Sequence, residues 1–207
     1  MLLTLVDALR CPAHEEESSL VLSVEEWAGP RVSEGVLGCP VCHARYRIHR
    51  GAVEFAPGAE SVRRPGALVD PVRLAAQLSL TEPGGIILLT GRFAEVHEEL
   101  AQFSEVTFVL VDAALTTSPM AVNFFVLDRL PLVARALRAA AIDEGSASVL
   151  TDVVRCVRSG GRLVMPAASV PPTGLTVIAR DDRELVGEVA AITRPVSLRR
   201  ADPPPGV

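Results

Sequence analysis

Two short pairs of metal-binding residues constrain this chain more than any other feature. Two residues separate Cys11 from His14, and two separate Cys39 from Cys42. A tight turn with this spacing presents two ligands to one ion, and two such turns complete a tetrahedron of the thiolate and imidazole ligands that zinc prefers. In an intracellular chain, closely spaced cysteine pairs indicate a metal site rather than disulfides. We therefore predict a structural zinc site at Cys11, His14, Cys39 and Cys42, without an open coordination position.

The fourth ligand has alternatives. His43 and His49 are the other histidines of this region, although His43 directly follows a cysteine ligand and its geometry disfavours ligation. A further alternative is that His14 is a loop residue beside a site that has lost its metal. Cys156 stands apart from both pairs in a helical pattern, and we interpret it as a buried core cysteine.

Composition excludes several classes of function. The net charge is −5, which argues against a protein whose main task is to hold nucleic acid phosphates. All 20 basic residues are arginine, so neither a Schiff-base lysine nor a P-loop lysine exists here. No apolar run approaches the roughly 20 residues of a membrane span, and the first residues lack the pattern of a secretory signal. We expect a cytoplasmic protein that neither enters a membrane nor binds nucleic acid as its main task.

The chain divides into four parts. Residues 1–55 hold three of the four cysteines, three of the four histidines and the only Trp and Tyr. Residues 56–69 contain two prolines and two glycines and predict a linker. Residues 70–195 alternate between strand and helix patterns, which predicts a small α/β domain of Rossmann type with a mostly parallel sheet and helices on both faces. The proline-rich residues 196–207 predict a tail.

Local patterns predict the individual elements. In residues 1–55 we expect a short helix at 3–10, a strand at 20–24, and two further strands at 46–49 and 52–55 of a small antiparallel sheet. Later strands are predicted at 86–89, 106–111, 122–127, 162–165, 175–180 and 183–189. Helices are predicted at 71–80, 93–103 and 147–157.

Three details sharpen these predictions. Asp70 and Pro71 suit the N-cap and first position of the helix at 71–80. Phe93 and Phe103 mark the ends of one apolar face of the helix at 93–103, and a pair of glycines at 160–161 would stop the helix at 147–157. Residues 130–142 fit either a helix or a chain that reaches a strand at 138–143.

The first 55 residues resemble the small zinc-ribbon activator of tRNA, rRNA and release-factor methyltransferases. The resemblance rests on the helix at 3–10 with CP at 11–12, LGCPVC at 37–42, YRI at 46–48 and GAV at 51–53. In that family a Tyr-Pro-Ile strand and a Gly-Ile-Pro turn follow the second pair of ligands; here Arg47 replaces the proline, and His14 replaces the second cysteine. The resemblance implies an α+β zinc ribbon that binds and stabilises a methyltransferase through an exposed edge strand.

Residues 70–195 resemble a degenerate class I S-adenosylmethionine-dependent methyltransferase. The run VLTDVVRCVRSGGRLVM at 149–165 is similar to the helix, the R-x-L-x-P-G-G-R-L-V run and the strand of that family, with Ser159 in place of the proline. LPL at 130–132 and the stretch 138–143 are similar to the segment that leads to the family's fourth strand, which favours a strand at 138–143. The predicted closing hairpin would be the antiparallel pair that ends such sheets.

The same resemblance implies a cofactor site at Gly91 and Asp112. The family places a glycine-rich turn after its first strand and an acidic residue, which holds the ribose hydroxyls, after its second. Here Gly91 is the only glycine of that turn and bulky residues follow it; the alternative is a glycine that starts a helix and a surface aspartate. We identify no catalytic residue. His97 lies among glutamates that look like a solvated face, and residues 143–146 predict a turn with a helix cap.

These observations lead to three functional hypotheses. The first is a noncatalytic fusion of a zinc ribbon and a methyltransferase-like domain, which binds or stabilises a partner protein, itself a methyltransferase in one version, through the ribbon's edge strand. The second domain could instead occupy that edge in cis, because the tether gives it a high effective concentration. The alternative is an active S-adenosylmethionine-dependent methyltransferase with its activator fused in cis. The third is a nucleic-acid module that uses Arg45, Arg47 and Arg50, which the acidic total disfavours.

Overall fold

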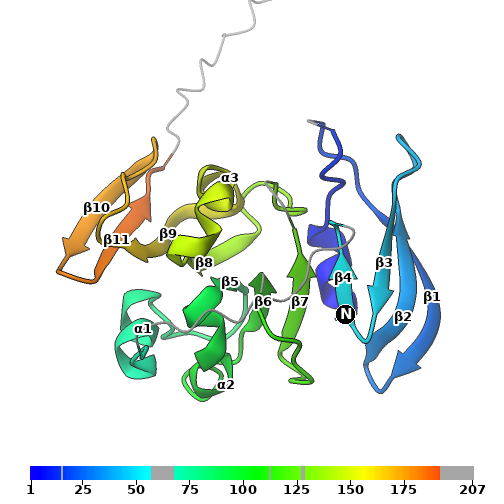
Figure 1. Cartoon of the computed structure of the whole chain (residues 1–207), viewed down its shortest axis with the longest axis horizontal. Coiled ribbons are helices and arrows are strands. Elements are labelled where there is room, and N and C mark those ends of the chain that lie inside the picture. The colour runs from blue at the N-terminus through cyan, green and yellow to red at the C-terminus, as the bar shows by residue number, and fades with distance from the viewer. Residues whose placement is uncertain (15, 57–67, 112, 127–128, 192–207) are drawn as a thin grey trace, which may run out of the picture.

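The computed structural model describes residues 1–14, 16–56, 68–111, 113–126 and 129–191. Its strands are β1 (Val21–Ala28), β2 (Arg31–Gly38), β3 (Arg45–His49), β4 (Ala52–Glu54), β5 (Ile86–Thr90), β6 (Thr107–Val111), β7 (Ala121–Phe125), β8 (Leu137–Ala141), β9 (Val157–Pro166), β10 (Leu175–Arg180) and β11 (Glu184–Val189). They form one continuous sheet in the order β1-β2-β3-β4-β7-β6-β5-β8-β9-β11-β10, which runs from right to left across Figure 1.

The N-terminal part is a small antiparallel sheet, as predicted. Strands β1 to β4 pair successively in antiparallel fashion. The helix expected at 3–10 is a 3-10 helix, η1 (Leu3–Ala8), and the strand expected at 20–24 extends to Ala28. The buried side chains of this part, such as Leu5 and Ile48, belong to the same core cluster as Leu163 and Met165 of β9. The N-terminal part therefore shares a core with the rest of the chain.

The C-terminal part confirms the predicted mostly parallel sheet with an antiparallel hairpin at its end. Strands β7, β6, β5, β8 and β9 are parallel neighbours, whereas β11 pairs antiparallel with β9 and with β10. The segment that fitted either helix or strand contains β8, and all five residues of β8 are buried. This part is therefore an α/β arrangement with a mostly parallel sheet.

Helices cover both faces of this sheet (Figure 1). Helix α1 (Pro71–Gln77) begins as predicted, because the Asp70 carboxylate accepts the N–H groups of Val72 and Arg73. Helix α1 packs with η2 (Gly91–Val96) and α2 (His97–Leu100) against one face. Helix α3 (Leu150–Cys156) follows η3 (Glu144–Val149) and packs against the other face, where Cys156 is fully buried as expected.

Two helix predictions need correction. The expected helix at 93–103 is a 3-10 turn followed by the four residues of α2, and Phe103, at 45% exposure, lies outside its apolar face. The glycines at 160–161 do not end α3, because the chain is already extended at Val157 and β9 begins there. They lie in a bulge of β9, in which the four residues 158–161 stand opposite the single residue Arg138 of β8. A Cβ at Gly161 would lie 2.5 Å from the Arg138 carbonyl oxygen.

A parallel strand pair joins the two parts. Val53 and Glu54 of β4 pair with Phe124 and Phe125 of β7, and the N–H groups of the next two residues both donate to the Phe125 carbonyl. The second of these, Ala56, was expected to begin the linker and is buried. Residues 57–67 of that linker, and the predicted tail at 196–207, lie outside the described residues. Among the residues described, none of the helices has the length and apolar character of a membrane span.

Candidate functional site

The four predicted metal ligands converge at one point. The ligand atoms of Cys11, His14, Cys39 and Cys42 all lie within 4.8 Å of one another. Cys11 Sγ is 3.6 Å from Cys42 Sγ, and His14 Nε2 is 3.4 Å from Cys39 Sγ. A zinc tetrahedron with ordinary bond lengths has sulfur–sulfur edges of about 3.8 Å and nitrogen–sulfur edges of about 3.6 Å. The four side chains therefore fit a zinc ion, with one imidazole and three thiolates as its ligands.

Local backbone structure explains how these ligands are presented. The first pair follows η1, and the Cys11 N–H group donates to the Ser18 carbonyl, which closes the loop around the pair. In the second pair, the Cys39 carbonyl accepts the His43 N–H group, and His43 takes a left-handed backbone conformation. Among the described histidines, His14 is the one that joins the cysteines, because His49 Nδ1 lies 3.1 Å from a Glu34 carboxylate oxygen on the ribbon sheet.

The electrostatic surroundings differ between the cysteines. Burial raises the pKa of the Cys11 thiol. Burial acts in the same direction on Cys39, but the Cys42 N–H group, the His14 ring and the Val41 N–H group outweigh it and lower the pKa of Cys39 to about 6. Cys39 is therefore a thiolate near neutral pH, which is the form that binds a metal.

Tyr46 is a part of this site that sequence reasoning missed. Its hydroxyl lies 3.1 Å from Cys11 Sγ, and the residue is 7% exposed. Burial and the contact with Cys11 raise the pKa of Tyr46, which keeps its hydroxyl protonated and able to donate to a thiolate. Such outer partners orient metal ligands and tune the bound ion. The signal in the sequence was the only tyrosine of the chain, placed four residues after the second ligand pair.

Gly91, one of the two proposed cofactor residues, lies in a different region, at the carboxyl ends of the parallel strands. The strand order reverses between β5 and β8, and open α/β sheets bind ligands beside such a switch point. Gly91 follows β5 there, with a φ of +51°. Asp143, two residues beyond β8, fills the space next to it: a Cβ added at Gly91 would lie 2.7 Å from Asp143 Cβ. Asp112, the other predicted cofactor residue, lies outside the described residues.

An ionic network closes this end of β5. The Asp143 carboxylate accepts the Arg92 N–H group at 3.1 Å, and the Arg92 guanidinium lies 3.5 Å from Asp143 and 3.6 Å from Glu184. Glu184 also accepts from Gln77 and pairs with Arg73 of α1. The Arg92 side chain is 15% exposed. Charged side chains of the chain itself thus occupy the position where such a sheet would hold a ligand.

His97 does not lie on a solvated face, which corrects the prediction. It is buried, its Nδ1 lies 2.8 Å from the Ala94 carbonyl oxygen, and its Nε2 lies 3.1 Å from Thr116 Oγ1. Because a carbonyl can only accept, Nδ1 carries the proton and Nε2 accepts from Thr116. The Asn123 side chain in turn accepts the Thr116 N–H group, so these side chains fix the loop after β6.

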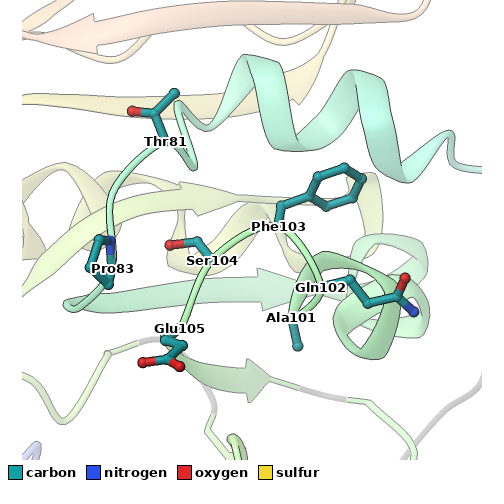
Figure 2. A pocket seen from close by; sticks show the side chains of 7 residues that line it. All are labelled: Thr81, Pro83, Ala101, Gln102, Phe103, Ser104 and Glu105. Atoms are coloured by element: carbon teal, nitrogen blue, oxygen red, sulfur yellow. The ribbon is translucent and has the colours of Figure 1, made fainter.

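Two surface hollows have structural explanations. Figure 2 shows a hollow lined by Thr81, Ser104 and Phe103, before the amino-terminal ends of β5 and β6; the Ser104 hydroxyl donates to the Glu82 carbonyl. A second hollow gathers three arginines beside the bulge of β9. Arg138 and Arg162 donate there to carbonyl groups in and after the last turn of α1, which is the expected way to satisfy a helix C-terminus.

Comparison with known proteins gives partial similarities. The chain matches geranyl diphosphate methyltransferase in complex with SAM over 46% of each chain, with 16% identity and a TM-score of 0.39. It matches the antibiotic-resistance methyltransferase Kmr over 63% of this chain and 98% of that one, with 15% identity and a TM-score of 0.40. A chain from a complex containing the Haloferax volcanii Trm112 methyltransferase activator matches over 57% and 88%, with 11% identity and a TM-score of 0.42. No protein-family model and no curated protein matches.

Proposed function

We propose that this protein is a noncatalytic methyltransferase-like scaffold, stabilised by a zinc ribbon docked in cis, which binds a partner protein. The observation that carries the proposal is the contact between Asp143 and Gly91 at the switch point of the sheet. S-adenosylmethionine would need the backbone after β5 to approach it closely, as nucleotide cofactors do at glycine-rich turns. Here the carboxylate of Asp143 and the guanidinium of Arg92 fill that approach.

The pairing of the strands supports a partner surface on the outer strand β1. The ribbon's inner edge strand, β4, pairs with β7, so the edge that the family resemblance assigns to a partner is used within this chain. The outer strand β1 has β2 as its single neighbour in the described sheet. It exposes Val21 at 62% and Trp27 at 51% beside two glutamates. In this proposal a partner strand adds to β1, with main-chain hydrogen bonds supplying affinity and Trp27 supplying an apolar anchor.

The strand order favours a second candidate, an active S-adenosylmethionine-dependent methyltransferase. Its switch point lies between β5 and β8, and Gly91 has the positive φ that a tight turn before a cofactor requires. In that case Arg92 and Asp143 would have to separate to admit the cofactor.

A calorimetric titration of the zinc-loaded protein with S-adenosylmethionine separates the two candidates. The scaffold proposal expects no binding heat at two temperatures, and binding at micromolar strength would refute it. The Asp143→Ala variant serves as a control for access, because it removes the carboxylate beside Gly91 without adding volume. If the variant binds the cofactor and the parent chain does not, the Asp143 side chain is the block.

Partner binding has its own test. A photo-activated crosslinking residue placed at Trp27 should capture one defined protein in cells of the source organism. The same residue at Ile178, which is exposed on the opposite edge strand β10, is the matched control. Equal capture from both positions, or none from position 27, would contradict a partner surface on β1.

A further inference from the structure

The loop that carries the first two metal ligands also forms the contact with the C-terminal part. While Cys11 and His14 face the metal cage, the backbone just before Cys11 binds residues 131–133. The Arg10 N–H group donates to the Pro131 carbonyl, and the Val133 N–H group donates to the Ala8 carbonyl, both at 2.9 Å. We call these contacts between residues 8–17 and residues 129–134 the seam.

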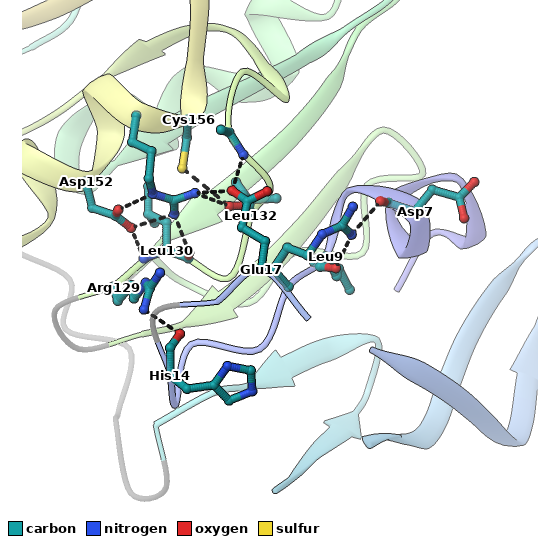
Figure 3. Close-up of polar contacts among 12 residues, drawn as sticks. Asp7, Leu9, His14, Glu17, Arg129, Leu130, Leu132, Asp152 and Cys156 are labelled. Atoms are coloured by element: carbon teal, nitrogen blue, oxygen red, sulfur yellow. Dashed lines mark hydrogen bonds and ion pairs between the residues drawn. The ribbon is translucent and has the colours of Figure 1, made fainter. Parts of the chain in front are cut away.

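Figure 3 shows the polar side chains that complete the seam. An Arg129 guanidinium nitrogen donates at 2.5 Å to the backbone carbonyl oxygen of His14, whose side chain is one of the four predicted metal ligands. A Glu17 carboxylate oxygen accepts the Ala134 N–H group at 2.8 Å and lies 3.2 Å from Arg155. Arg155 also donates to the Leu132 carbonyl at 2.8 Å. Backbone groups of the irregular segment 129–134 thus find partners on the metal loop or on a side chain that pairs with it.

A second connection runs through aromatic rings. The Tyr46 hydroxyl contacts Cys11 Sγ, and the Tyr46 ring lies 5.0 Å from the ring of Phe55. Phe55 in turn lies edge-on to Phe124 of β7, with the ring centroids 5.3 Å apart. One metal ligand is therefore connected by direct contacts to the strand that β4 pairs with.

We infer that metal in the cage of Cys11, His14, Cys39 and Cys42 locks the seam, so that metal binding and docking of the ribbon on β7 form one coupled equilibrium. Without metal, the two ligand pairs lose the ion that bonds them to one another, and the loop between residues 8 and 17 gains conformational freedom. Its hydrogen bonds to residues 129–134 then lose their fixed partner. The coupling is reciprocal, because a weaker seam must weaken metal binding by the same factor.

The coupling of metal binding to docking of the ribbon affects whether this chain associates with other chains. Strands β4 and β7 are three to five residues long and bury their pairing edges against each other. When the seam opens and the ribbon undocks from β7, both strands become unpaired edges, which recruit strands from other chains. Metal loading therefore decides whether β4 pairs within this chain or is available to another one.

The coupling can be tested by amide hydrogen exchange of the full chain, measured with zinc bound and again after a chelator has removed the zinc. Metal removal should reduce the protection of the Val133 and Ala134 amides about tenfold or more, because their acceptors lie on the metal loop. The amides of Leu89 in β5 and Ala140 in β8 should keep their protection. Unchanged exchange at 133–134 overturns the proposal, and so does simultaneous loss of protection in all strands, which would mean that the metal holds the whole fold.

Reciprocity provides an independent measurement. Glu17→Gln weakens the seam without touching a ligand, and it should lower zinc affinity by roughly fivefold, a modest value because the ion pair is partly exposed. Glu16→Gln makes the same charge change at an exposed neighbouring residue and should leave the affinity unchanged. Equal affinities of the two variants would overturn the coupling. A purified protein without stoichiometric zinc would overturn the proposal at its first step, whatever the outcome of the cofactor titration.

Discussion

Replacing Tyr46 by phenylalanine removes one hydroxyl from the metal centre and little else. The ring remains, with its packing 5.0 Å from Phe55, so the strand pairing that surrounds it is preserved. What is lost is the contact between the hydroxyl and Cys11 Sγ at 3.1 Å. The variant therefore isolates the outer hydrogen bond of a metal ligand from the packing that supports it.

The magnitude follows from the charge on the acceptor. In the metal-bound state Cys11 is a thiolate, and a buried hydrogen bond to a charged group contributes about 1.5–3 kcal/mol. Tyr46 is 7% exposed, so water does not readily replace its hydroxyl. The loss corresponds to a zinc affinity about 10- to 100-fold lower, which is the range found when outer partners of metal ligands are removed.

Competition between the protein and a chromogenic zinc chelator measures this change near neutral pH. The stability of the metal-free chain, measured by denaturant unfolding, should differ little between Tyr46→Phe and the parent, since the hydroxyl then faces a thiol. An affinity within about twofold of the parent would refute the assignment of Tyr46 to the metal centre. Equal losses of affinity and of metal-free stability would also refute it, because they would indicate a general packing defect.

Two further variants test the fold. The N–H groups of Glu184 and Arg183 and the Arg73 guanidinium lower the pKa of Asp181 to about 2. Denaturant unfolding should therefore show that Asp181→Asn is less stable than the parent, by the full amount above about pH 4, and this difference in stability should vanish as the pH falls through about 2. The control Asp182→Asn removes a carboxylate that lacks these contacts and should change the stability little. Phe124→Ala should lower the free energy of unfolding by about 3–5 kcal/mol, because its side chain is fully buried beside β4, whereas Phe103→Ala at an exposed position should cost less than about 1 kcal/mol.

Local features of the sequence predicted much of this structure. The two ligand pairs, the N-cap at Asp70 and the apolar runs of β5 and β6 depend on residues close together in the chain, and each occurs as expected. The strand β8 needed the resemblance as well, because its alanines and leucine fit a helix equally well by propensity. Its backbone pairs with β5 on one side and β9 on the other, and all five of its residues are buried, which helix propensity does not take into account.

The features that the sequence did not predict share a physical cause: each depends on a contact with a residue distant in the chain. His97 looked solvated because glutamates flank it, yet Thr116, which is 19 residues further along the chain, provides a partner that allows it to be buried. The turn at 143–146 was predicted, but not that Asp143 would bind the Arg92 N–H group across the sheet. No rule of sequence spacing connects Tyr46 with Cys11, because their contact depends on how β3 lies against the metal loop.

The parallel pairing of β4 with β7 occupies the inner edge strand of the N-terminal sheet. A ribbon that works in trans must keep its inner edge strand free, at the risk of pairing with unintended chains. Here β7 occupies that edge, Phe55 and Phe124 bury it, and the metal loop reinforces it from the side. The same contacts close one edge of the parallel sheet, which would otherwise end at β7. Each part thus satisfies the unpaired strand of the other, and while β4 and β7 are paired, any further strand must add at β1 or β10, the two remaining edges of the described sheet.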